Sequence, residues 1–199
     1  MDAIETLMNE HRTIERAIDA LVSFVDEVRR KTTDDKAELG RFVTFIREFA
    51  DACHHGKEED ILFAAMVEAG FPSRGGPIAV MVMEHGQGRV LVGILAELAG
   101  QATPWSGDDR QRLARAANGY AELLRAHIHK EDAVLYPMAE QRLSPAQLAR
   151  VGADCERYEA QTAGAGERDR LHRLAGELLE RHAPLVHREP HAAHGGCRG

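Results

Sequence analysis

The sequence predicts an all-α protein, and two observations carry that prediction. Apolar residues recur every three or four positions through most of the 199-residue chain, which is the spacing of amphipathic helices. Proline breaks helix interiors, and the seven prolines leave four long stretches free of it, at 1–71, 78–103, 105–136 and 146–183. We therefore expect an up-down antiparallel four-helix bundle, followed by two additional C-terminal helices and a flexible tail.

The first two helices are expected at 2–30 and 34–69. Ile14 and Ile18 belong to an apolar stripe that runs along the first of them at helical spacing. The polar turn at 31–34 contains residues that commonly cap helices, and it separates the two helices.

The third and fourth helices are expected at 77–100 and 107–141, on either side of Pro104. In the third, Met81 and Val92 lie on the apolar face. In the fourth, the apolar residues again recur at three- and four-residue intervals, which is the pattern of a helix rather than of a strand. Helix ends predicted in this way are uncertain by a few residues.

Two shorter helices are expected to follow. Ser144, Pro145 and Gln147 form a capping-box start, with a serine cap, a proline at the first helical position and a glutamine at the third. This helix is expected to end near residue 161, and the next to span 167–182.

The chain is thus expected to divide into three parts. Residues 1–141 form the bundle, 142–183 form a helical extension, and 184–199 form a flexible tail rich in proline, glycine and histidine. The tail either binds metal transiently during loading of the protein or carries its histidines incidentally.

Composition excludes several classes of protein. With 25 basic and 32 acidic side chains, the formal charge is −7, which argues against a general nucleic-acid binder. No apolar run approaches the roughly 18 residues of a membrane-spanning helix. The three cysteines are widely spaced and form neither a disulfide framework nor a CxxC metal motif. We therefore expect a cytoplasmic protein without a membrane partner.

Four of the 11 histidines continue the apolar faces of the four long helices, and a glutamate follows two of them by four residues. A carboxylate among buried apolar residues is costly unless it is paired or bound to metal. Counted along the helices, all six side chains reach the same level of the bundle to within roughly 5–8 Å. These candidate ligands are His11, His54, Glu58, His85, His127 and Glu131.

Neutral imidazoles and carboxylates suit iron, manganese or zinc. Four histidines and two carboxylates can hold two metal ions if the carboxylates bridge them and each metal takes two histidines. Such a site leaves coordination positions open for water, oxide or a small gas. Bundle cores commonly host sites of this kind.

Four segments of the chain resemble the hemerythrin-like, or HHE cation-binding, family. They are Asn-Glu-His at 9–11, His-His-Gly-Lys-Glu-Glu-Asp-Ile-Leu-Phe at 54–63, Met-Glu-His at 83–85 and His-Ile-His-Lys-Glu-Asp-Ala-Val-Leu-Tyr-Pro at 127–137. The resemblance covers about 1–141. It implies a four-helix bundle with a non-haem di-iron centre, in which the four histidines named above are ligands and the two glutamates bridge the metals.

Two registers compete within these segments. His55 and Glu59 also have HxxxE spacing, but the Leu-Phe pair that follows favours the register of His54. Asp132 follows His127 with the four-residue gap that is seen in oxygen-carrying hemerythrins. Glu131 is preferred, because it gives the second motif the same HxxxE spacing as His54 and Glu58. On this basis His55 and His129 are expected to be exposed or to lie behind the ligands.

The chain departs from the family pattern in its third helix, where oxygen carriers supply two histidines. Four residues on either side of His85 stand Met81 and Arg89, so a fifth histidine is missing. Arg89 either hydrogen-bonds a bridging carboxylate or bound anion, or covers the surface. Tyr120 either lines the cavity or packs in the core, and Tyr136 is expected to serve packing.

The resemblance implies, and the open coordination positions allow, a protein that binds or reacts with O2, nitric oxide or peroxide at two iron ions. The alternatives are a catalase- or peroxidase-like di-iron enzyme and an iron storage or donor protein for iron–sulfur repair. Zinc and manganese are the less favoured metals, because a tetrahedral zinc site would leave some of the six side chains unexplained.

Overall fold

The structure is a computed structural model that describes residues 3–31, 34–162 and 166–183. The described residues form helices and contain no strand, so the all-α prediction is confirmed. The predicted tail at 184–199 lies outside the described residues.

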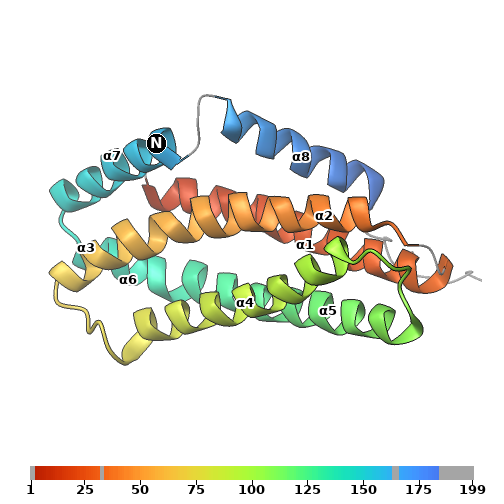
Figure 1. The fold of residues 1–199 in the computed structure, drawn as a ribbon. Coiled ribbons are helices and arrows are strands. Elements are labelled where there is room, and N and C mark those ends of the chain that lie inside the picture. The colour runs from red at the N-terminus through yellow and green to blue at the C-terminus, as the bar shows by residue number, and fades with distance from the viewer. Residues whose placement is uncertain (1–2, 32–33, 163–165, 184–199) are drawn as a thin grey trace, which may run out of the picture.

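Four long helical rods form the body of the molecule (Figure 1). The first rod is α1 (Ala3–Lys31) and the third is α4 (Gly76–Gly100). The second and fourth rods are composite and contain π-helical segments. The second rod comprises α2 (Lys36–Phe45), η1 (Ile46–His55), η2 (Glu58–Leu62) and α3 (Phe63–Glu68), and the fourth comprises α5 (Gly107–Lys130), η3 (Glu131–Leu135) and α6 (Tyr136–Arg142).

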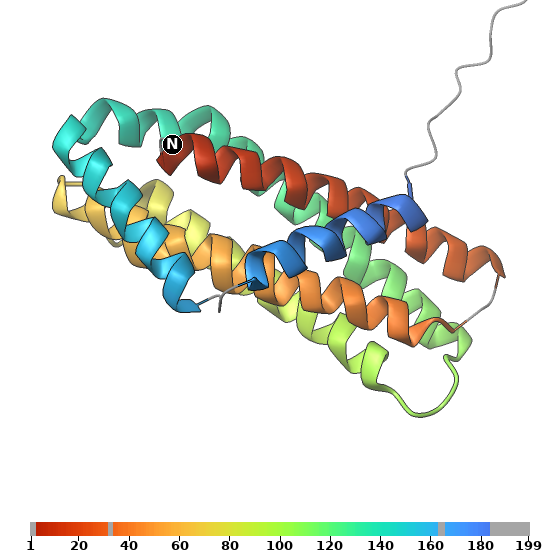
Figure 2. The same cartoon turned by 90° about the horizontal axis from the view of Figure 1, so that it is seen from above.

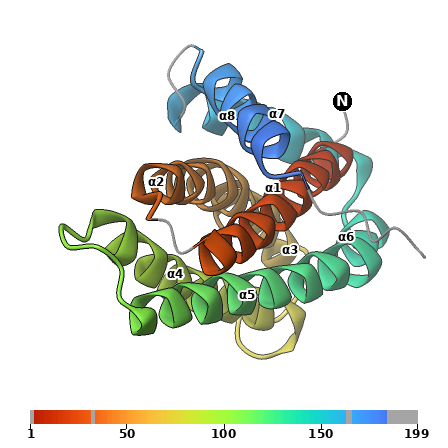
Figure 3. The same ribbon diagram turned by 90° about the vertical axis from the view of Figure 1, so that its right-hand side faces the viewer.

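The rods lie side by side as a helical bundle, and the chain reverses direction from each rod to the next (Figures 1 and 3). The fourth rod packs through α5 against both α1 and α4, and α2 packs against α4. Two further helices, α7 (Pro145–Thr162) and α8 (Glu167–Arg181), lie outside the bundle and cover the first and second rods (Figure 2).

The predicted capping box at the start of α7 is confirmed. The backbone N–H of Ser144 donates to Gln147 Oε1 at 2.9 Å, and the backbone N–H of Gln147 donates to Ser144 Oγ at 3.3 Å. These bonds satisfy two donors that a helix start would otherwise leave without partners.

The core consists of two apolar clusters with a polar belt between them. One cluster includes Ile14 and Val92, and the other includes Leu7 and Met81. In α1 and α4 these residues flank a buried histidine on either side. Buried polar groups need partners, so the belt is where a functional site is expected.

The three π-helical segments lie in this belt. In a π-helix the backbone bonds run from residue i to i+5, and such segments are rare and occur frequently at functional sites. Both η2 and η3 begin at a glutamate of the HxxxE motifs, Glu58 and Glu131. The wider turn reduces the angle between consecutive side chains, which allows neighbouring residues to face the same interior.

By length and apolar composition alone, α4 would pass as a membrane span. In this structure it packs along α5 and α2 and directs His85 into the core. A core helix of a bundle meets the same two criteria, so the observation does not argue for a membrane.

Candidate metal centre

The polar belt brings all six predicted ligands together, and each of the six side chains is buried. Their candidate atoms fall into two clusters, within each of which the atoms lie within 4.8 Å of one another. We call these the first and second ligand groups. The first ligand group is His11, His54, Glu58 and Glu131, and the second is His55, Glu58, His85 and His127.

His55 is the main correction to the sequence-based prediction. It was expected to be exposed or to lie behind the ligands, but it is only 5% exposed and belongs to the second ligand group. Its ring stacks on that of His85, with centroids 3.9 Å apart. The π-helical segment η1 ends at His55, and its wider turn lets His54 and His55 both face inward. The cluster therefore contains a fifth histidine, which comes from the second rod rather than from α4.

Glu58 lies between the two ligand groups. Its Oε2 atom is 3.7 Å from His54 Nε2 and 3.5 Å from His85 Nε2, and it has no hydrogen-bond partner among the described residues. Its Oε1 atom accepts a hydrogen bond from the Tyr136 hydroxyl at 2.5 Å. One oxygen is thus held by the protein, and the other faces one histidine of each group.

Glu131 has the same relation to the other two histidines. Its Oε2 atom is 3.3 Å from His11 Nε2 and 3.1 Å from His127 Nε2. Neither of its oxygens has a hydrogen-bond partner among the described residues. The alternative ligand Asp132 points elsewhere, because its Oδ1 atom accepts from His11 Nδ1 at 2.7 Å.

Every histidine of the two groups meets a carboxylate through its Nδ1 atom. An ionised carboxylate can only accept, so Nδ1 carries the proton and Nε2 presents a lone pair to the centre of the site. Such carboxylate–histidine pairs are typical of metal ligands. The pairs are His11 with Asp132 (2.7 Å), His54 with Glu10 (2.8 Å), His55 with Asp51 (3.3 Å), His85 with Glu59 (2.7 Å) and His127 with Glu84 (2.9 Å).

In the centre of the site, hydrogen-bond acceptors such as the Nε2 lone pairs of the histidines therefore face one another. The Nε2 atoms of His85 and His127 approach to 3.0 Å, and His54 Nε2 has no hydrogen-bond partner among the described residues. Lone pairs at this separation repel one another, and buried acceptors without partners are costly. Cations placed between them would remove both costs, so the residues present fit a metal centre.

Cations lie on the far side of these carboxylates. Lys57 Nζ donates to Glu10 at 2.5 Å, and Arg89 donates to Asp51 at 2.9 Å and to Glu59 at 2.7 Å. Arg89 thus binds neither Glu58 nor Glu131 and instead holds the carboxylates behind His55 and His85. In the same way Arg12 pairs with Asp132 and Lys130 with Glu84. These cations hold in place the carboxylates that fix the histidine tautomers.

The site is built from two similar halves. Glu-His occurs at 10–11 and at 84–85, and Lys-Glu followed by an acidic residue occurs at 57–59 and at 130–132. Each pair of segments makes equivalent contacts, with the same order of histidine, carboxylate and cation. The supporting residues Glu10 and Glu84 were missed at the sequence level, although the repeated Glu-His dipeptide was a signal that could have found them.

Two differences break this similarity. The residue after the motif histidine is His55 in the second rod and Ile128 in the fourth, and the residue five positions after the motif glutamate is Phe63 or Tyr136. Tyr136 was expected to serve packing only. It is fully buried, its hydroxyl donates to Glu58, and its ring stacks on His11 with centroids 5.4 Å apart.

The buried groups of the site differ in the direction of their pKa shifts. Burial and the charge of Glu131 raise the pKa of Glu58 well above its usual value. Burial acts in the same direction on Glu131, but the imidazoles of His11 and His127 outweigh it and lower the Glu131 pKa. Burial and neighbouring imidazoles lower the pKa of His85 to about 2, so this histidine is neutral, as a metal ligand must be.

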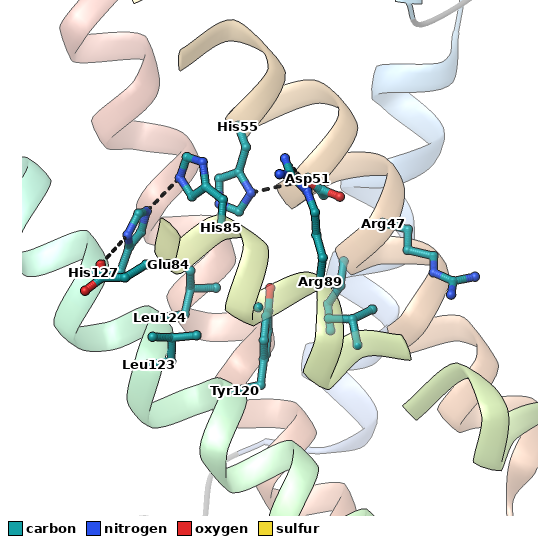
Figure 4. Close-up of a pocket in the computed structure, with 13 residues that line it drawn as sticks. Arg47, Asp51, His55, Glu84, His85, Arg89, Tyr120, Leu123, Leu124 and His127 are labelled. Carbon is teal, nitrogen blue, oxygen red and sulfur yellow. Dashed lines mark hydrogen bonds and ion pairs between the residues drawn. The ribbon is translucent and has the colours of Figure 1, made fainter. Parts of the chain in front are cut away.

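A cavity of about 200 Å³ adjoins the second ligand group (Figure 4). His55, His85 and His127 line it, whereas His11, His54 and Glu131 are not among its lining residues. Its remaining wall combines apolar and aromatic side chains such as Val92, Leu124 and Tyr120 with charged ones that include Arg89. Figure 4 shows the hydroxyl end of Tyr120 directed toward the histidines. Tyr120 is therefore both a buried residue and a cavity-lining one.

The remaining histidines and cysteines are outside the centre. His129 is exposed, as expected, and Cys53 is buried but belongs to neither ligand group. His182 packs beside Phe24, and its Nε2–H donates a hydrogen bond to Glu38 Oε1 at 3.1 Å. The tail at 184–199, whose histidines were considered as metal binders, lies outside the described residues.

Fold and site together define a helical protein with a buried cluster of histidines and carboxylates that is able to bind metal ions. The model of the hemerythrin HHE cation binding domain matches residues 2–139. Because this match covers more than half of the chain, the protein belongs to that family.

Relatives of the chain include uncharacterized proteins of Mycobacterium bovis and Mycobacterium tuberculosis, each 26% identical over 149 residues. The aligned region covers 73% of this chain and 56% of each relative, so the chain matches just over half of their length. No solved structure matches the chain significantly. These relatives add no activity to the family assignment.

Proposed function

We propose that the protein holds two iron ions and binds or reacts with O2, nitric oxide or peroxide. The observation that carries this proposal is the set of inward-facing acceptors, which form two ligand groups that share Glu58 and several of which have no hydrogen-bond partner among the described residues. In the proposal the rods form an up-down antiparallel four-helix bundle, which their order and contacts support. Two irons would supply open coordination positions and reversible electron transfer to a small ligand.

The first ion would be held by His11 and His54, and the second by His55, His85 and His127. Glu58 and Glu131 would bridge the two ions, because each faces one histidine of either group. Five imidazoles and two carboxylates exceed the four ligands of a structural zinc site. The donor set therefore favours iron over zinc.

The cavity indicates where the small ligand would bind. It opens onto the histidines of the second ligand group alone, so the ligand would reach the ion on that side. Val92 and Leu124 would form part of its apolar wall, and the Tyr120 hydroxyl would donate a hydrogen bond to the ligand.

The first test is metal content, measured together with an ultraviolet–visible spectrum on protein purified without a histidine tag. Two irons per chain, with oxo-bridge absorption that changes on addition of peroxide or nitric oxide, are expected. Zinc, or no iron after anaerobic reconstitution, would contradict the proposal.

The cavity also favours a peroxide-consuming enzyme as a second candidate, because the open side is accessible and contains a phenol. Peroxide turnover by the two-iron protein would support this candidate, and reversible O2 binding without turnover would exclude it. We further propose a cytoplasmic location, which the acidic charge and the widely spaced cysteines support.

A further inference from the structure

The two halves of the site differ in how their lysines are placed. Lys57 supports the pair Glu10–His54, and Lys130 supports the equivalent pair Glu84–His127. The side chain of Lys130 is 39% exposed, whereas that of Lys57 is 1% exposed. Water solvates one lysine, while the protein alone must satisfy the other.

The C-terminal extension causes this difference. Helix α7 packs over η1 and η2, and its residue Glu159 accepts a hydrogen bond from Lys57 Nζ at 2.5 Å. The other oxygen of Glu159 accepts from Arg168 of α8 at 3.1 Å. An unbroken chain of polar contacts therefore runs from α8 through Glu159, Lys57 and Glu10 to His54 Nδ1.

We propose that Glu159 is a positioning residue of the metal centre, through which the C-terminal extension sets the metal affinity of the first ligand group. This inference rests on the proposed metal-binding function. It assigns a role at the site to a residue that lies outside the matched family domain, which ends at residue 139.

The physical basis is the division of one positive charge between two carboxylates. While Glu159 shares Lys57, Glu10 retains enough negative charge to bind the N–H of His54 strongly. That bond holds the imidazole with Nε2 inward and increases the basicity of Nε2. Without Glu159, Glu10 alone neutralises the positive charge of Lys57. The hydrogen bond from His54 Nδ1 to Glu10 then weakens, and the affinity of His54 Nε2 for metal falls.

The test compares Glu159→Gln with Glu156→Gln. Both residues lie on α7 and line the same pocket of about 160 Å³ beside Lys57. Among the described hydrogen bonds, however, Lys57 donates to Glu159 and Glu10 and not to Glu156. Each variant is titrated with Co²⁺ against a chromophoric chelator to give the affinity of both ion positions. Metal-free protein labelled with ¹⁵N-histidine reports the tautomer of His54 by nuclear magnetic resonance.

Glu159→Gln is expected to weaken one Co²⁺ position by about tenfold, at the lower end of the range for groups behind metal ligands, and to shift the His54 resonances. Glu156→Gln should match the wild type in both measurements. Unchanged His54 resonances in Glu159→Gln would overturn the proposal, as would an equal loss at both positions. Failure of the wild type to bind Co²⁺ would contradict the proposed function instead, and the metal-free spectra would still decide the role of Glu159.

Discussion

The two ligand groups arise from the same repeated motif but have different surroundings. The first ligand group has two histidines, is stacked against Tyr136 and does not line the cavity. The second has three histidines and adjoins the cavity. The comparison teaches that two halves built on one motif can differ in access: they differ at Ile128 against His55 and at Phe63 against Tyr136, and the half that contains His55 is the one that adjoins the cavity.

The largest expected effect is on metal content, in variants that test whether the two ligand groups share Glu58 and Glu131. Glu131→Ala or Glu58→Ala is expected to lower the metal content from two ions per chain to one or none, because each glutamate faces a histidine of both groups. Metal analysis of the reconstituted variants measures this. Glu122→Ala, at an exposed position on α5, is the control, and retention of two ions in the glutamate variants would disprove the bridging assignment.

The second prediction compares neighbouring histidines that belong to different groups. His54→Ala leaves the first group with a single imidazole and is expected to weaken that ion by more than about 100-fold, beyond the range for groups behind the ligands. His55→Ala leaves two imidazoles in the second group and is expected to cost only about tenfold. Chelator competition with Co²⁺ measures both, and an unaltered affinity in His55→Ala would remove His55 from the ligand set.

The third prediction concerns access to the second group. Gly88 lines the cavity, and a Cβ atom there would lie 3.5 Å from Tyr120 Cε2, an ordinary contact distance. Gly88→Val is therefore expected to fill part of the cavity and to slow nitric oxide binding to the ferrous protein by about tenfold, equivalent to about 1.4 kcal/mol in the barrier. Stopped-flow spectroscopy measures the rate.

Gly93→Val is the matched control for that experiment. Gly93 is exposed on the same helix, and a Cβ atom there would meet nothing within 4 Å. Both variants carry the same cost of a β-branched residue in a helix. Equal rates in the two variants would show that the ligand enters by another route.

The smallest expected effect lies on the enclosed side. Tyr136→Phe removes the hydrogen bond to Glu58 Oε1 and is expected to lower the unfolding free energy of the metal-free protein by about 1 kcal/mol. Urea denaturation measures the change. Tyr158→Phe, which loses a partly exposed bond to the Ala52 carbonyl, should cost less, and equal stability of Tyr136→Phe and the wild type would return Tyr136 to a packing role.

The helical rods could be predicted within a few residues because their limits are written locally. The helix expected at 77–100 is observed as Gly76–Gly100, and that expected at 107–141 as a rod that ends at Arg142. Prolines and the Ser144 cap act on the backbone next to them, so no distant contact is needed to place these boundaries.

His55 and Tyr136 could not be placed in the same way. The position of His55 depends on the pitch of η1, and apolar spacing read at 3.6 residues per turn does not reveal a π-helix. The role of Tyr136 depends on Glu58, which is 78 residues away in the chain. Both features are tertiary, whereas the six residues first identified shared a periodicity that the sequence itself displays.

The burial of Lys57 beneath α7 has a consequence for the order of assembly during synthesis. Chains emerge from the ribosome N-terminus first, so the segments that carry both ligand groups leave it before Glu159 does. Until α7 docks, Lys57 is solvated much as Lys130 remains in the finished protein. In the nascent domain the two lysines therefore have similar surroundings, and the last helices to be made distinguish them.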